Sequence, residues 1–233
     1  MPDTPAPAPA KTKKLGVRAR SKLEREDRIR LAARHLFAEQ GYDATTLRQI
    51  ARAADLALGT LFNYISDKRD LIYLIFNEEL DSVTDKALSA PRPWQSFRAK
   101  ILSITEPHFR LFGADPTLAR ILLSEILLQS PGLHLARYRD IRNRLIEGIQ
   151  ELVSAAQQSG ELRSSESAEL IARHIFFSLS GVLRWWLASC KRPKWAAGQR
   201  DFERILILQI NGLAESQSVS APAPAPRRGH RSK

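Results

Sequence analysis

The sequence has few of the features that mark secreted or membrane proteins. Its single cysteine, Cys190, cannot form an internal disulfide, which suits a chain kept in a reducing compartment. No apolar run approaches the ~20 residues that a transmembrane helix needs, and the N-terminus lacks the apolar stretch of a signal peptide. We therefore expect a cytoplasmic protein that does not enter a membrane.

Motifs that carry catalysis are also missing. The sequence contains no phosphate-binding G-x-x-x-x-G-K, no H-E-x-x-H, no nucleophile elbow, and no His or Cys cluster with the spacing of metal ligands. His108 and His174 have no obvious partner in the sequence, and Cys190 falls in a predicted interface helix. The sequence predicts a protein that is not an enzyme and uses no metal or cofactor.

Positive charge is plentiful but gathers near the two ends of the chain. Of the 36 basic residues, six lie in 11–22 and four in 227–233. Without these ten and Asp3, the rest of the chain has 26 basic and 24 acidic side chains and is almost neutral. Each cluster adjoins a Pro-Ala run, so residues 1–21 and 218–233 are predicted to be extended, mobile tails. Such tails act either as solubilising arms or as polyanion-binding arms.

If the N-terminal tail binds DNA, its basic side chains would contact phosphates or a minor groove. The candidates are Lys13, Lys14, Arg18 and Arg20.

Between the tails, apolar residues recur with helical spacing almost throughout, which predicts an all-α chain of about nine helices. We expect Pro107 to kink or interrupt its helix, and Gly41 and Gly160 to end theirs. Proline follows a capping residue at Asp115-Pro116 and Ser130-Pro131, which marks two helix starts. The expected helices cover residues 23–40, 46–53, 57–64, 67–89, 94–112, 116–128, 131–159, 167–189 and 202–213.

The first short helices have the spacing of a helix-turn-helix. Ile50, Ala54, Leu61 and Phe62 are assigned to the inner face, which leaves the other face for a major groove ~12 Å wide. In this arrangement Phe62 faces the core and Tyr64 reaches the DNA backbone. The predicted DNA-binding residues are Thr46, Arg48, Leu58, Gly59, Thr60, Asn63, Tyr64 and Lys68.

Residues 29–71, IRLAARHLFAEQGYDATTLRQIARAADLALGTLFNYISDKRDL, resemble the signature of the TetR family of transcriptional regulators. The family pattern has an A-x-x-L-F-x-x-x-G-Y helix end, then T-T-x-x-I-A, then G-T-L-Y-x-Y-F-x-S-K. The resemblance implies a three-helix DNA-binding domain, a linking helix, a divergent ligand-binding domain and a homodimer. It also implies that Thr46, Arg48, Thr60, Tyr64 and Lys68 occupy positions that usually contact DNA.

The turn departs from the family pattern. The usual A-G-V-S becomes Ala54-Asp55-Leu56-Ala57. Asp tolerates the left-handed conformation better than most residues, so we expect the turn to form. Ala57 cannot cap the recognition helix as Ser would, a loss on the order of 1 kcal/mol.

The second half of the chain is predicted to hold a ligand site and a dimer interface. Residues 175–186 and 202–213 are apolar over most of the helix circumference, so segments 167–189 and 201–213 are expected to pair with a second copy. A small apolar or amphipathic effector would bind among the helices of residues 94–189. The candidate lining residues are Phe97, His108, Phe109, Phe112, Tyr138, Arg142, His174, Phe176, Phe177, Trp185 and Trp186.

These predictions divide the chain into a basic arm (1–21), a helix-turn-helix domain (22–66), a linking helix with a ligand-binding and dimerisation domain (67–217), and a basic tail (218–233). The predicted function is that of a homodimeric repressor, released from a palindromic double-stranded DNA operator by a small molecule. The alternative is an architectural or division-linked DNA-binding protein that needs no ligand.

Overall fold

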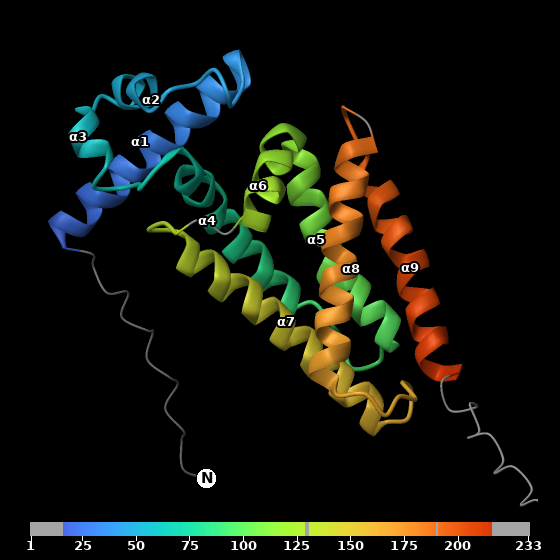
Figure 1. Cartoon of the computed structure of the whole chain (residues 1–233). Coiled ribbons are helices and arrows are strands. Elements are labelled where there is room, and N and C mark those ends of the chain that lie inside the picture. Colours follow the sequence, from blue (N-terminus) through green and yellow to red (C-terminus); the bar gives the residue numbers. More distant parts are fainter. Residues whose placement is uncertain (1–15, 129–130, 190, 216–233) are drawn as a thin grey trace, which may run out of the picture. The chain divides into compact units, whose positions relative to one another are not determined.

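The computed structural model describes residues 16–128, 131–189 and 191–215, and within these ranges the protein is α-helical with no strand (Figure 1). This confirms the predicted all-α fold. Residues 1–15 of the predicted N-terminal tail, with Lys13 and Lys14, the predicted C-terminal tail, Ser130 and Cys190 lie outside the described residues, whereas residues 17–21 are helical and not extended as predicted. The helices are α1 (Val17–Gln40), α2 (Leu47–Ala53), α3 (Leu58–Leu61), α4 (Lys68–Leu88), α5 (Phe97–Ala114), α6 (Pro116–Leu128), α7 (Leu135–Gln158), α8 (Ala168–Ser189) and α9 (Trp195–Glu215).

The chain forms two compact units. Of the described residues, the first unit contains 16–75 and the segment 131–134, which directly precedes α7. The second unit contains 76–128 and the described residues from Leu135 onward. Helix α4 therefore begins in the first unit and ends in the second.

Helix α1 begins at Val17, six residues before its predicted start. Arg18 and Arg20 consequently lie on the first turns of a helix and not in an extended arm. The first turn of α1 contains no acidic side chain. The C-terminal end agrees with the prediction, since Gly41 adopts φ 85° and its N–H donates to the carbonyl of Phe37 at 3.1 Å.

In the second unit, α5 continues through Pro107 without interruption. Trp94, expected on this helix, precedes it and is exposed. Helix α9 begins at Trp195, seven residues earlier than predicted. Asp115 Oδ1 accepts the backbone N–H of Leu118 at 3.1 Å, as expected for the start of α6, and Gly160 follows the end of α7 with φ 76°.

Aromatic packing holds the centre of the second unit. Phe109 of α5 is fully buried, with its ring centroid 5.5 Å from Trp186 of α8 in an edge-to-face contact and 6.2 Å from Phe202 of α9. A Cβ built at Gly198 would lie 2.8 Å from both Phe109 and Trp186, so a glycine allows α9 to pack this closely. Within the described ranges, no helix is both long and apolar enough to span a bilayer.

Candidate DNA-binding surface and ligand cavity

Helix α2 is fixed at its start by reciprocal hydrogen bonds. The Thr46 hydroxyl accepts the backbone N–H of Gln49 at 3.3 Å, and the Gln49 side chain accepts the backbone N–H of Thr46 at 2.8 Å. This capping box corresponds to T-L-R-Q at residues 46–49 and was not predicted. The Thr46 hydroxyl therefore has a structural partner in addition to any contact with DNA.

The turn between α2 and α3 forms as expected from its sequence. Asp55 adopts φ 55°, the left-handed conformation that a glycine usually supplies. Ala57 is the N-cap of α3 and offers no side-chain hydrogen bond, which confirms the predicted loss of a cap.

The regular part of α3 is shorter than predicted, Leu58–Leu61 in place of 57–64. After Leu61 the backbone tightens, since the N–H of Asn63 donates to the carbonyl of Thr60 at 3.1 Å and that of Tyr64 to Leu61 at 2.9 Å. Ile50, Ala54 and Leu61 are buried, as predicted for the inner face.

The predicted orientations of Phe62 and Tyr64 are wrong. Phe62 is 47% exposed and Tyr64 only 7% exposed, the reverse of the expectation. The tight turn after Leu61 rotates both side chains away from the positions that a continued α-helix would give them. The Tyr64 hydroxyl accepts a hydrogen bond from Arg25 Nη1 of α1 at 3.4 Å.

The remaining candidate DNA contacts lie on the surface of the first unit. Thr46, Arg48, Gly59 and Asn63 are exposed, and Leu58, Thr60 and Lys68 are half-buried. Lys68 Nζ donates to the carbonyl of Asp43 at 3.2 Å and lies 4.3 Å from the centroid of the Tyr42 ring.

Gly59 has no intramolecular reason to be a glycine. A Cβ built there finds no neighbouring atom within 4 Å, and its φ is not in the left-handed region. The absent side chain therefore leaves open space outside the protein, as a helix backbone that approaches a groove closely would require.

Asp70 forms a junction that was not predicted from the sequence. Its carboxylate is 1% exposed and accepts three backbone N–H groups, from Ser66 (2.9 Å), Leu133 (3.0 Å) and His134 (2.8 Å). The His134 ring donates from Nε2 to the carbonyl of Tyr64 at 2.8 Å. The segment before α7 is thus bound to the residues that follow the recognition helix.

One further hydrogen bond at this junction joins residues that are close together in the chain. Asp67 Oδ1 accepts the N–H of Asp70 at 2.7 Å, as an N-cap would, but Asp70 reaches Ser66 and not Asp67. A Cβ at Gly132 would lie 2.4 Å from Asp70 Oδ1, so the close approach needs glycine there.

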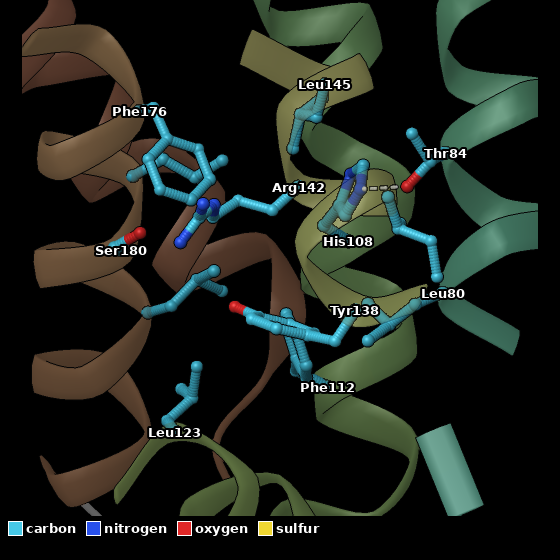
Figure 2. Close-up of a pocket in the computed structure, with 13 residues that line it drawn as sticks. Leu80, Thr84, His108, Phe112, Leu123, Tyr138, Arg142, Leu145, Phe176 and Ser180 are labelled. Atoms are coloured by element: carbon cyan, nitrogen blue, oxygen red, sulfur yellow. Dashed lines mark hydrogen bonds between the residues drawn. The ribbon is translucent and has the colours of Figure 1, made fainter. Parts of the chain in front are cut away.

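The second unit contains an apolar cavity of about 50 Å³ between α4, α5, α6, α7 and α8 (Figure 2). Of the predicted ligand contacts, His108, Phe112, Tyr138, Arg142 and Phe176 line it. The other lining residues are Leu80, Thr84, Leu123, Ile141, Leu145, Leu179, Ser180 and Leu183.

The remaining predicted ligand residues lie elsewhere in the unit. Phe97, Phe109 and Trp186 are buried in the core, whereas His174, Phe177 and Trp185 are exposed on α8. Helical spacing alone does not say which side of α8 meets the cavity, because that helix is apolar over most of its surface.

A buried polar pair lies at one side of the cavity. His108 Nε2 is 3.3 Å from Thr84 Oγ1, and His108 Nδ1 is 3.0 Å from the carbonyl of Ile104. Burial lowers the pKa of His108 to about 4, although the hydrogen bond to Ile104 opposes this shift. The imidazole is therefore neutral near pH 7.

Arg142 and Phe176 separate this cavity from an outer groove. Both residues line the cavity, and both also line the groove on the surface of α7 and α8, together with Glu147 and Arg173. Figure 2 shows the Arg142 guanidinium beside the Phe176 ring, on the side of the cavity formed by α8.

Ion pairs join α4 to α7 beside the cavity. Asp81 accepts a hydrogen bond from Arg137 at 3.0 Å, and Arg144 contacts both Asp81 and Asp85. Partial burial would raise the pKa of Asp81, but the hydrogen bonds and charges of the two arginines outweigh it and lower that pKa.

Helices α8 and α9 carry large apolar side chains on the outside of the second unit. Trp185 is 76% and Leu208 71% exposed, and both line an open groove with Val182 and Ile205. A Cβ at Gly181 finds no atom within 4 Å, so this surface is open. The Ser178 hydroxyl accepts a hydrogen bond from Gln209 Nε2 of α9 in the same chain.

Comparison with known proteins agrees with this description. Residues 29–73 match the family model described as "Bacterial regulatory proteins, tetR family". A fatty acid metabolism regulator protein of Bacillus subtilis is 24% identical over 184 residues, which is 77% of this chain and 92% of the relative.

Two solved structures share the fold. FadR from Bacillus subtilis, in complex with stearoyl-CoA, superposes with a TM-score of 0.62 at 22% identity over 78% of this chain and 97% of that one. A FadR repressor from Thermus thermophilus, in complex with lauroyl-CoA, gives 0.61 at 22% identity over 86% and 98%. Residues 29–73 are a DNA-binding domain of the TetR family, and the protein is a DNA-binding transcriptional regulator.

Proposed function

We propose that the protein is a homodimeric repressor whose release from a palindromic operator is caused by an amphipathic acyl-CoA. The observation that carries this proposal is the double role of α4. Near its start, Asp70 binds the residues that follow the recognition helix, and farther along Leu80 and Thr84 line the apolar cavity. A ligand that displaces α4 at the cavity would therefore act on an element that also positions the DNA-reading surface.

The class of ligand is supported by the cavity and by relatives of the same fold. The lining is mainly aliphatic and aromatic, which suits an acyl chain. The FadR structures from Bacillus subtilis and Thermus thermophilus hold stearoyl-CoA and lauroyl-CoA. The cavity of about 50 Å³ is smaller than the ~300 Å³ of typical ligand pockets, so binding must move lining side chains.

Arg142 and Phe176 are the side chains that we expect to move. They form the wall that the cavity shares with the outer groove. The acyl chain would pass between them, while the polar part of the ligand stays outside with the guanidinium of Arg142.

Dimerisation through α8 and α9 is supported by their exposed apolar surface. Covering Trp185 and Leu208 with the same helices of a second copy would remove large apolar side chains from water. Two recognition helices held in this way can enter successive major grooves when they are ~34 to 36 Å apart, so a small change in separation changes affinity.

On the first unit, the proposed DNA contacts are Thr46, Arg48, Leu58, Gly59, Thr60, Asn63 and Lys68. Tyr64 remains a candidate through its hydroxyl, although most of its side chain is buried. Arg48 is the clearest single test, since its side chain is exposed and far from the cavity in sequence.

The test is a nuclease footprint of the full chain on the DNA upstream of its own gene, at ~0.15 M salt where nonspecific binding is weak. We expect a compact palindromic site that Arg48→Ala abolishes and that long-chain acyl-CoA, but not free CoA, removes. A long footprint unaffected by acyl-CoA would refute the proposal and favour the architectural alternative.

A further inference from the structure

The hydrogen-bonding pattern of Thr84 and His108 leaves the polar side of the cavity without a free donor. A backbone carbonyl can only accept, so His108 Nδ1 carries the proton that is shared with Ile104 at 3.0 Å. Nε2 is then an acceptor in the neutral ring. The Thr84 hydroxyl, 3.3 Å away, must donate its proton to Nε2.

What the pair still offers is the oxygen of Thr84, which keeps lone pairs after its proton is used. Both side chains are almost completely buried, so water does not compete freely for this oxygen. Protonation of His108 would change the pattern, but burial lowers its pKa to about 4, far below neutral pH. At neutral pH this side of the cavity therefore accepts hydrogen bonds and does not donate them.

The other polar groups of the cavity lie away from this pair. In Figure 2, Thr84 and His108 lie toward α4 and α5, whereas the Tyr138 hydroxyl, the Arg142 guanidinium and Ser180 lie toward α8. The acceptor is thus separate from the guanidinium that we expect to meet the polar part of an acyl-CoA. It faces the region where the apolar part of the ligand would lie.

We propose that Thr84 and His108 select an acyl chain that carries a hydroxyl group over the same chain without it, and over the same chain with a carbonyl in its place. This inference rests on the proposed acyl-CoA response. A hydroxyl group donates to Thr84 Oγ1 and leaves the existing pair intact. A ligand carbonyl can only accept, so Thr84 would have to turn its proton away and leave Nε2 buried without a partner.

The expected preference follows from the value of one buried hydrogen bond. A neutral hydrogen bond contributes roughly a threefold to tenfold gain in affinity for the hydroxylated chain. The oxo chain should bind more weakly than the unsubstituted chain by a similar factor, because its binding leaves buried polar atoms unmatched.

The test is calorimetric titration of the full chain with acyl-CoA probes of equal length: unsubstituted, β-hydroxy, β-oxo, terminally hydroxylated and terminally oxidised to the aldehyde. We expect at least one hydroxylated probe to bind more tightly than the unsubstituted one, and its carbonyl counterpart to bind more weakly. In His108→Phe the Thr84 proton is free to turn toward the ligand, so discrimination between hydroxyl and carbonyl should disappear. Ser180→Ala is the matched control, since it removes a lining hydroxyl near α8 and should keep the preference.

The outcomes separate this inference from the function on which it rests. If the unsubstituted probe binds at least as tightly as every hydroxylated one, the inference is refuted and the acyl-CoA response stands. If no probe binds, both are refuted. If His108→Phe does not fold, the wild-type and Ser180→Ala titrations decide the question by themselves.

Discussion

Replacing Asp70 by asparagine tests the junction between the segment before α7 and the end of the recognition helix. The substitution keeps the size of the side chain but exchanges one carboxylate oxygen for an NH₂ group. In the native protein, Oδ2 accepts the N–H groups of Ser66 and Leu133, and Oδ1 accepts that of His134. The single amide oxygen of asparagine can accept at most the N–H groups that face one of the two carboxylate oxygens.

The cost can be worked out from these bonds. In the better orientation the amide oxygen keeps the hydrogen bonds from the N–H groups of Ser66 and Leu133, and the NH₂ group faces the N–H of His134. One buried unmatched donor costs about 1 to 3 kcal/mol, and the two bonds that remain lose the strength that a charged acceptor provides. We expect Asp70→Asn to lower the free energy of unfolding by about 2 to 4 kcal/mol.

Asp67→Asn is the matched control, because it removes a charge at the same end of α4. Asn caps a helix about as well as Asp, so this variant should stay within about 0.5 kcal/mol of the wild type. Urea unfolding gives both values, and hydrogen exchange should show faster exchange of the Leu133 and His134 amides in Asp70→Asn alone. Equal stability of the two variants would show that the junction contributes nothing.

Three further predictions concern the recognition helix, the cavity and the apolar surface. Gly59→Ala should raise stability by up to about 1 kcal/mol, since its Cβ meets nothing, but should weaken operator binding in fluorescence anisotropy; unchanged binding would exclude close contact at Gly59. The pKa of His108 is about 4 in the folded protein against the ordinary value of 6.5, so protonation of this residue favours the unfolded chain. The free energy of unfolding of the wild type should therefore fall by about 2 kcal/mol from pH 7 to pH 5. Urea unfolding of His108→Phe at the two pH values should lack this contribution. Leu208→Glu should leave the helical content unchanged and shift the protein toward monomer in analytical ultracentrifugation, whereas an unchanged mass would place the dimer interface elsewhere.

Several features of the protein could be predicted from local sequence because local physics determines them. Helical periodicity gave the fold class, and Gly41 and Gly160 marked helix ends that the positive φ angles confirm. The left-handed Asp55 and the uncapped Ala57 were likewise predicted from residue chemistry within one turn of chain. Family resemblance in residues 29–71 supplied the identity of the domain, which the match to residues 29–73 confirms.

Other features depended on contacts between residues far apart in the chain. The exposed Phe62 and buried Tyr64 follow from a tightened turn whose neighbours include Arg25, 39 residues away. Asp70 looks in the sequence like an ordinary residue of a helix start, yet its partners Leu133 and His134 are more than sixty residues away. Helical spacing could list the apolar residues of α5, α7 and α8, but only their packing divides them into core, cavity and open surface. The sequence by itself determined the helices and the DNA-binding motif, since these need only near neighbours. Only the tertiary structure determined the junction at Asp70 and the hydrogen-bond acceptor formed by Thr84 and His108. The role of a buried polar group depends on the hydrogen-bond partners that the fold places beside it.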